Sequence, residues 1–129
     1  MSHDTPQKPT ASELEILGVL WERGPSTVRE VHEALCKKRE VGYTTVLKLL
    51  QIMTAKAIVQ RNEEQRAHVY EARLPAEETK KQFAGDLLER VFKGSTSELM
   101  MHALSGRKTS RKELDELRHL LDRYERKRR

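Results

Sequence analysis

From Thr10 to Leu35, hydrophobic and polar positions recur with the period of amphipathic helices. After Thr10, apolar side chains recur at three- and four-residue spacing, which places them on one face of an α-helix. They are Leu14, Ile16, Leu17, Leu20 and Trp21. Thr10 and Glu13 have the spacing of a capping box at the start of this helix, and Gly24-Pro25 stops it.

A second capping box, formed by Thr27 and Glu30, opens the next predicted helix. Its inward positions are Val28, Val31, Ala34 and Leu35. The basic run at residues 37–39 marks its end, because cations are favourable at the carboxyl end of a helix dipole. Thr27 also lies at a helix start, where backbone N–H groups can meet a phosphate, so it is a candidate DNA contact as well as a cap.

Residues 41–56 predict a third helix with two faces of different character. The apolar face has i, i+3, i+4 and i+7 spacing and consists of Val46, Leu49, Leu50 and Met53. The opposite face carries Thr44, Lys48, Gln51 and Ala55. No acid occurs between residues 44 and 55, and hydroxyls, amides, a cation and small side chains are groups that reach into a DNA major groove. We interpret this stretch as a recognition helix; the alternative is a surface helix that happens to lack acids.

Beyond residue 57 the period changes from that of a helix to that of a strand. Residues 58–61 and 66–71 are short, β-branched or aromatic, and roughly alternating, and residues 62–65 join them as a hairpin connection. Three helices followed by a hairpin make a winged helix-turn-helix, whose third helix enters the major groove. The expected fold is therefore mainly α with a small β-hairpin, and Lys48, Arg61 and Arg66 are the expected cationic contacts to DNA.

The pattern of residues 75–125 predicts three further helices with more apolar surface than they can bury on one another. The apolar positions are Phe83, Leu87, Leu88, Val91, Leu99, Met100, Leu104, Leu114, Leu117, Leu121 and Tyr124. The last four are spaced like the a and d positions of a coiled coil. We expect a helical dimerisation arm that packs on a second copy. The alternative is that these helices pack back on the winged helix of the same chain.

These patterns divide the chain into four segments. Residues 1–9, with two prolines among polar residues, are expected to be a disordered lead-in. Residues 10–74 form the predicted winged-helix DNA-binding domain, and residues 75–125 the helical dimerisation domain. Residues 126–129 are a basic tail that is expected to fray into solvent.

Composition supports a nucleic-acid partner. The 129 residues fit one domain, or one small domain with an appendage, and 36% apolar residues allow only a modest core. A net charge of +5 is the electrostatic footprint of a polyanion-binding protein, although mildly basic proteins are common.

The single cysteine and the lack of long apolar runs indicate a protein of the cytoplasm. Cys36 has no partner for an internal disulfide, which fits a reducing compartment, and its place in a helical pattern favours a small buried or half-buried residue. No apolar run approaches the length of a membrane span, and the N-terminal residues lack the apolar stretch of a signal peptide. Membrane insertion is therefore not expected.

No motif of the sequence predicts a metal site, a cofactor or catalysis. The five histidines are scattered without the spacing of metal ligands. Metalloprotease, nucleophile-elbow and phosphate-loop motifs do not occur. A DNA-binding regulator is favoured by the acid-free face at residues 44–55. The competing classes are a winged helix that binds proteins instead of DNA, and a metal-responsive repressor.

Three blocks of the sequence resemble the BlaI/MecI/CopY family of penicillinase repressors. They are residues 13–22 (ELEILGVLWE), 43–47 (YTTVL) and 66–70 (RAHVY), and the likeness extends from Thr10 to about Leu121. The resemblance implies a homodimeric winged-helix repressor of a palindromic operator, whose third helix meets the bases with its N-terminal end. The matching positions are Tyr43, Thr44, Thr45 and Lys48.

The resemblance also implies a route of release, because in β-lactam-responsive members a membrane-bound sensor protease triggers cleavage of the arm. The chain departs from the family at three places. Gln65 stands where the wing often has a glycine, which predicts a wider turn. The staphylococcal Asn-Phe cleavage bond is replaced by His102-Ala103, so Met101, His102 and Ala103 mark a candidate cleavage region for a different bond or a different protease. The cysteine pair of copper-responsive members cannot form with Cys36 alone.

Overall fold

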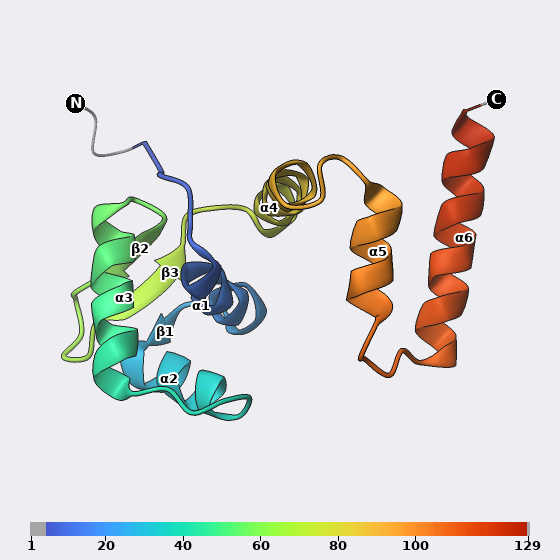
Figure 1. Cartoon of the computed structure of the whole chain (residues 1–129). Helices are drawn as coiled ribbons and strands as arrows, with labels where there is room; N and C mark the ends of the chain where they lie inside the picture. The colour runs from blue at the N-terminus through green and yellow to red at the C-terminus, as the bar shows by residue number, and fades with distance from the viewer. Residues whose placement is uncertain (1–4, 129) are drawn as a thin grey trace. The chain divides into compact units, whose positions relative to one another are not determined.

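The computed structural model describes residues 5–128, and the chain divides into two compact units, residues 1–82 and 83–129. The first unit contains α1 (Ala11–Arg23), α2 (Val28–Cys36), α3 (Tyr43–Ala55) and three short strands (Figure 1). The strands are β1 (Ser26–Thr27), β2 (Val59–Asn62) and β3 (Val69–Ala72). The limit between the units falls within α4 (Ala76–Arg90), and α5 (Thr96–Leu104) and α6 (Arg111–Lys127) belong to the second unit.

Both predicted capping boxes of the first unit are confirmed. The Thr10 hydroxyl accepts a hydrogen bond from the Glu13 N–H at 3.2 Å, and Glu13 Oε1 accepts one from the Thr10 N–H at 2.9 Å. Thr27 and Glu30 make the same two bonds at 3.2 and 2.9 Å. Because each box satisfies donors that the helix itself leaves without a partner, it fixes where α1 and α2 begin.

One apolar core lies between the three helices and the sheet of the first unit. Its fully buried members include Ile16, Leu17, Val31, Val46, Leu50, Met53, Ile58, Val59 and Tyr70. Removal of these side chains from water is the main term that stabilises the unit. Trp21 is half-buried against this core, and its indole N–H donates to the carbonyl of Leu74 at 2.9 Å.

The sheet has three strands, where the sequence predicts a hairpin alone. β3 is central and antiparallel to both neighbours, with Ala72 opposite Val59 of β2 and Tyr70 opposite Ser26 of β1. β1 is only two residues long, so an alternating pattern cannot reveal it. The winged-helix fold is confirmed, with this additional strand directly before α2.

The wing loop is longer than the four residues expected from the strand pattern, in line with the wider turn expected at Gln65. β2 ends at Asn62 and β3 begins at Val69, so residues 63–68 join the strands in place of the expected residues 62–65. The Asn62 side chain accepts a hydrogen bond from the Glu64 N–H at 2.9 Å, and such a side-chain turn bends the chain out of the strand. Arg66 therefore lies in the loop and not on a strand, as a correction to the expected hairpin.

Only three residues, Lys56 to Ile58, separate α3 from β2. Ala57 has φ of 63°, in the left-handed region that residues other than glycine seldom adopt. The Ile58 N–H donates to the Met53 carbonyl and the Ala57 N–H to the Thr54 carbonyl, both at 3.1 Å. These bonds close the end of the helix and hold the strand directly against it.

Residues 5–9 contain no helix or strand, but the Gln7 N–H donates to the Lys56 carbonyl at 2.9 Å. The expected disorder at residues 1–4 lies outside the described residues. The other end of the chain is more regular than predicted, since α6 continues through Lys127. Arg126 and Lys127 are therefore helical and not part of a frayed tail, and Arg129 lies outside the described residues.

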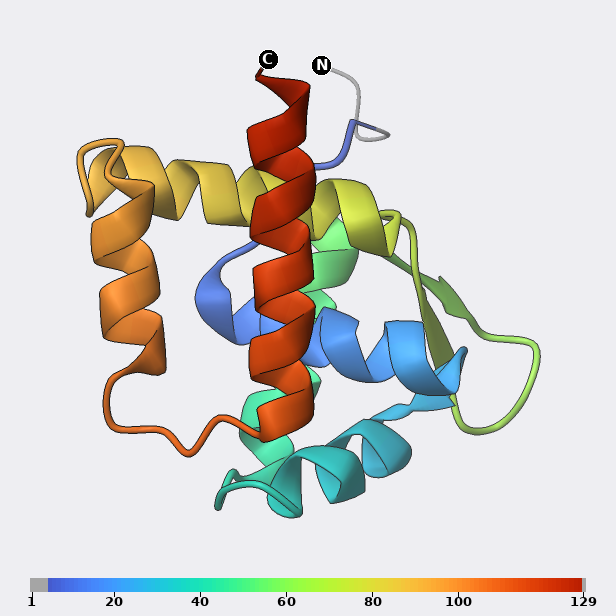
Figure 2. The same ribbon diagram turned by 90° about the vertical axis from the view of Figure 1, so that its right-hand side faces the viewer.

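None of the apolar side chains that the structure describes in the second unit is buried, and many are exposed. Figure 2 shows α5 and α6 as separate helices joined by a loop, and within the described residues neither helix buries a side chain. Ser95 and Ser110 accept hydrogen bonds from the Glu98 and Glu113 N–H groups at the starts of α5 and α6. Leu121 is 67% exposed and Tyr124 is 60% exposed. These side chains lie on the predicted dimer surface.

Candidate nucleic-acid interface

The exposed face of α3 carries the side chains that the sequence assigns to base recognition. Val46, Leu50 and Met53 are buried, and Leu49, expected beside them, is half-buried. Tyr43 is 48% exposed, and Thr44, Thr45, Lys48 and Gln51 are exposed along the same helix. Ile52, at 41% exposed, is an apolar side chain that the sequence did not single out on this surface. The face therefore offers hydroxyls, an amide, a cation and apolar contacts without any carboxylate.

The N-terminal end of α3 lacks the side-chain cap that α1 and α2 have. Its N-cap is Gly42, whose backbone is extended and which has no side chain to bond the first turn. The first backbone bond of the helix runs from the Val46 N–H to the Gly42 carbonyl at 3.2 Å. The N–H groups of the first turn thus have no side-chain cap from the N-cap residue, and they carry the partial positive charge of the helix dipole.

His32 of α2 holds the turn that leads into α3, a role that the sequence did not indicate. Its Nε2 lies 2.8 Å from the Val41 carbonyl, and its ring meets the Tyr43 ring edge-on at a centroid distance of 5.7 Å. The thiol of Cys36 lies 3.3 Å from the same ring nitrogen and 3.4 Å from the same carbonyl. Cys36 is exposed, contrary to the expectation of a buried or half-buried residue, because it lies at the open end of α2.

A second contact fixes the same turn from α1. Arg39 donates to Glu15 at 2.6 Å, and this bond lowers the pKa of the Glu15 carboxyl and raises the pKa of the Arg39 guanidinium. The sequence predicts residues 37–39 only as a helix end, since a pairing across 24 residues leaves no periodic signal. Lys37 and Lys38 remain exposed beside this ion pair.

Thr27 and Arg61 are both engaged within the chain. The capping box already uses the N–H and the hydroxyl of Thr27, and its backbone N–H lowers the pKa of Glu30. The Arg61 guanidinium donates to the Tyr70 hydroxyl, the main cause of its raised pKa, and to Glu63 at 3.1 Å. A phosphate that bound Arg61 would have to compete with the Glu63 carboxylate.

The tip of the wing is exposed. Arg66 and Gln65 lie in the loop of residues 63–68, and His68 lies 3.8 Å from Glu63. Figure 1 shows this loop extending from the sheet, next to which α3 stands. The structure thus places Arg61 and Arg66 on the hairpin beside the predicted recognition helix.

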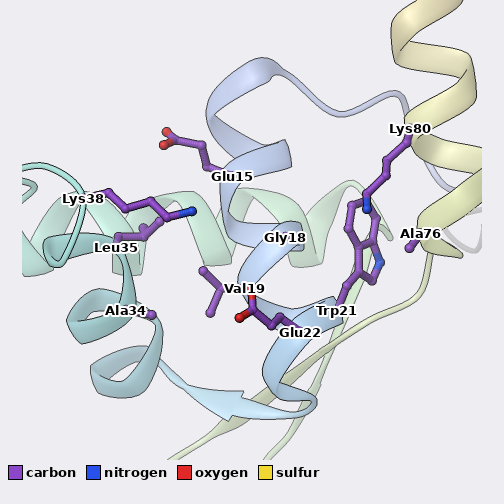
Figure 3. Close-up of a pocket in the computed structure, with 10 residues that line it drawn as sticks. All are labelled: Glu15, Gly18, Val19, Trp21, Glu22, Ala34, Leu35, Lys38, Ala76 and Lys80. Atoms are coloured by element: carbon purple, nitrogen blue, oxygen red, sulfur yellow. The ribbon is translucent and has the colours of Figure 1, made fainter. Parts of the chain in front are cut away.

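A groove of about 550 Å³ lies on another surface of the first unit, between α1, the end of α2 and the start of α4 (Figure 3). Glu15 and Glu22 line it together with Lys38 and Lys80. The Lys80 ammonium lies 5.8 Å from the centre of the Trp21 ring. Because this groove carries carboxylates as well as cations, it is a poorer match to DNA than the acid-free face of α3.

Within residues 5–128, no three histidine, cysteine or acidic side chains gather as a potential metal site. None of the helices there combines the length and the apolar character needed to cross a bilayer.

Comparison with known proteins decides the family. The sequence profile of the penicillinase repressor family matches residues 9–123. The chain belongs to this family. The resemblance inferred from the three sequence blocks is thereby confirmed.

Individual members of the penicillinase repressor family differ in how much of the chain they match. The transcriptional regulator BlaI of Mycobacterium tuberculosis is 44% identical over 59 residues, which cover 45% of this chain and 43% of that protein. The chain thus matches less than half the length of this relative. The penicillinase repressor of Staphylococcus aureus is 21% identical over 111 residues, covering 86% of this chain and 88% of the relative.

A solved structure shares the fold of the first unit. The solution structure of the DNA binding domain of the repressor BlaI aligns with a TM-score of 0.50 at 23% identity, covering 55% of this chain and 89% of that domain. At this identity the likeness supports the winged-helix architecture of a family member and nothing finer.

Proposed function

We propose that this protein is a homodimeric transcriptional repressor that binds a two-fold symmetric DNA operator through α3 and the wing. The observation that carries the proposal is the exposed, acid-free face of α3 within a winged-helix fold. An acid-free face favours entry of the helix into the major groove, because carboxylates would be repelled by the phosphates on either side. Two relatives are named as a transcriptional regulator and a penicillinase repressor. Both names agree with this function, and neither is the name of an enzyme.

In this function the exposed residues of α3 and of the wing have separate roles. Tyr43, Thr44, Thr45, Lys48 and Gln51 face the bases or the nearest phosphates. Arg66 in the wing binds the phosphate backbone of the DNA, and so does Arg61 once it is released from Glu63. Thr27 takes part only through the start of α2, since its own N–H and hydroxyl are used in the capping box.

The experiment that tests this function is selection of duplexes from a random library with the full-length protein. We expect a two-fold symmetric sequence whose half-sites lie about one helical turn apart or a multiple of it, because a dimer repeats its recognition helix by symmetry. Affinity for that duplex should fall steeply with salt as counterions are released. Recovery of no preferred sequence, together with salt-insensitive binding, would count against the proposal and favour a protein-binding winged helix.

Replacement of Lys48 separates base contact from phosphate contact. We expect Lys48→Ala to weaken binding to the selected duplex about tenfold, and to reduce the slope of log affinity against log salt by about one if the ammonium meets a phosphate. Titration of labelled duplex at several salt concentrations measures both. Lys81→Ala, which removes an exposed lysine from α4, is the control. Equal losses in the two variants would refute a specific role for Lys48.

The arm is proposed to join two copies through its exposed apolar stripe. α6 presents Leu114, Leu117, Leu121 and Tyr124 at the spacing of a helical seam, and Leu121 and Tyr124 are more than half exposed. A second copy of the chain carries the same stripe, and in a symmetric dimer the two stripes would cover each other. Phe83, Leu87, Leu88 and Val91 of α4 and its end, and Leu99, Met100 and Leu104 of α5, extend the proposed surface.

Release is proposed to occur by proteolysis of α5 in response to a signal such as a β-lactam, sensed by a membrane-bound protease. α5 buries no side chain, and Gly94 and Gly106 on either side have φ of 84° and 72°. A short helix without buried contacts opens locally at small cost. We expect mass spectrometry of the protein from β-lactam-treated cells to show a cut between Leu99 and Leu104, close to Met101, His102 and Ala103. A chain that stays full length while its target genes are induced would exclude this route.

A further inference from the structure

The entry into α3 is held by a contact from α2 and not by a cap of its own. Gly42 supplies no side-chain bond to the first turn, whereas threonine hydroxyls cap α1 and α2. Val41 is half-buried against the core, whereas Tyr43 is 48% exposed. The described contact that orients the Tyr43 ring is its edge-on packing against His32, at 5.7 Å and an interplanar angle of 79°.

The hydrogen bonds of His32 fix the plane of its ring. The Val41 carbonyl can only accept, so Nε2 at 2.8 Å must carry the proton and donate it. The Cys36 thiol donates to the same carbonyl at 3.4 Å, so one backbone oxygen receives bonds from two side chains of α2. A ring held by this bond presents a fixed edge to its aromatic neighbour, and T-shaped pairs are a preferred geometry of aromatic rings.

The geometry points to His32 as a residue that positions Tyr43 for sequence recognition in DNA. It sets the orientation of Tyr43, and with it the first turn of α3, while remaining outside the exposed face itself. This inference rests on the proposed function, because it assigns to α2 the control of the end of α3 that is proposed to meet the bases. His32 would then affect discrimination between sequences more than attraction to DNA in general, since phosphate attraction depends on charge and not on the orientation of one ring.

Three substitutions separate the two contacts of His32. His32→Gln retains an N–H near the position of Nε2 but removes the ring, and His32→Phe retains the ring but removes the N–H. His32→Ala removes both. His119→Ala, which deletes an exposed histidine of α6, is the matched control. All are made in the full-length chain, and thermal melts establish that each variant is folded.

The probes are the symmetric duplex recovered by random selection and a shuffled duplex of the same length and composition. We expect His32→Ala to weaken binding to the selected duplex about tenfold and binding to the shuffled duplex by less than about twofold. His32→Gln and His32→Phe should each show part of this loss. In a Tyr43→Ala background, His32→Ala should add less than about twofold, because the group that it positions is already absent.

Two results would overturn the inference while the proposed function stands. One is an equal loss on both duplexes, which would make His32 a purely structural residue. The other is an undiminished effect of His32→Ala in the Tyr43→Ala background. If the wild-type protein binds neither duplex, the proposed function fails, and the role of His32 in DNA reading fails with it.

A measurement without DNA tests the contact itself. We expect nuclear Overhauser effects between the ring protons of His32 and Tyr43 in the free protein. The Tyr43 ring resonances should shift more in His32→Gln than in His32→Phe, because only the former removes the neighbouring aromatic ring. Absence of these effects in folded wild-type protein would overturn the inference independently of any DNA result.

Discussion

A full-length variant with Leu117→Glu and Leu121→Glu is expected to be monomeric and to bind the operator at least about 100-fold more weakly than the wild type. Leu121 is 67% exposed and Leu117 is half-buried on α6, so both lie on the proposed seam. A carboxylate at either position would have to lose its water on dimerisation without gaining a partner. In a dimer, binding of one winged helix to its half-site raises the effective concentration of the second winged helix at the other half-site. A monomer loses this increase in affinity.

Sedimentation measures the assembly state of this variant, and titration of the selected duplex measures its affinity. The control is His119→Glu, which places a carboxylate on the same helix about 200° away from position 117. It should remain dimeric and bind normally. If the wild type is a monomer at micromolar concentration, or if the double variant keeps both its assembly state and its affinity, the arm does not serve dimerisation.

The second large effect is expected at Lys56. Its ammonium donates to Glu13 Oε1 at 2.6 Å, and the two side chains are only 18% and 3% exposed. Lys56→Met should destabilise the folded chain by about 3 kcal/mol, because it leaves the Glu13 carboxylate buried without its cation. Urea unfolding followed by circular dichroism provides the measurement.

The compensating variant distinguishes charge from packing. Adding Glu13→Gln to Lys56→Met removes the orphaned charge, and glutamine can still complete the capping box with Thr10. We expect the double variant to recover most of the loss, to within about 1 kcal/mol of the wild type. Equal stability of Lys56→Met and the wild type would show that this ion pair contributes nothing to the fold.

Local rules predicted the helices of the first unit well. Thr10 and Thr27 begin helices at the expected residues because a capping box depends only on neighbours three positions apart. The buried and exposed faces of α3 follow from its period, so Lys48 and Gln51 were assigned to the correct face. The family was also recognisable, because its sequence blocks coincide with these elements.

Contacts between distant segments were beyond such rules. β1 exists because Ser26 and Thr27 pair with β3 more than forty residues later, and two residues cannot show a strand period. The pairing of Arg39 with Glu15 and the packing of His32 on Tyr43 likewise depend on how α1, α2 and α3 meet in space. The expected wing loop was too short, because residues 66–68 alternate like a strand but lie beyond the last pair of the ladder, Asn62 with Val69.

The short junction at Lys56 to Ile58 has a consequence for how such regulators diverge. Two backbone hydrogen bonds and the left-handed conformation of Ala57 hold this junction, so small changes within it have little room to reorient the recognition helix relative to the wing. A change in the preferred operator sequence must then come from substitutions on the exposed surface of α3 and the wing. If the arm joins two copies, the distance between half-sites is encoded separately, in residues of the second unit. Sequence preference and operator spacing could therefore evolve independently within one gene.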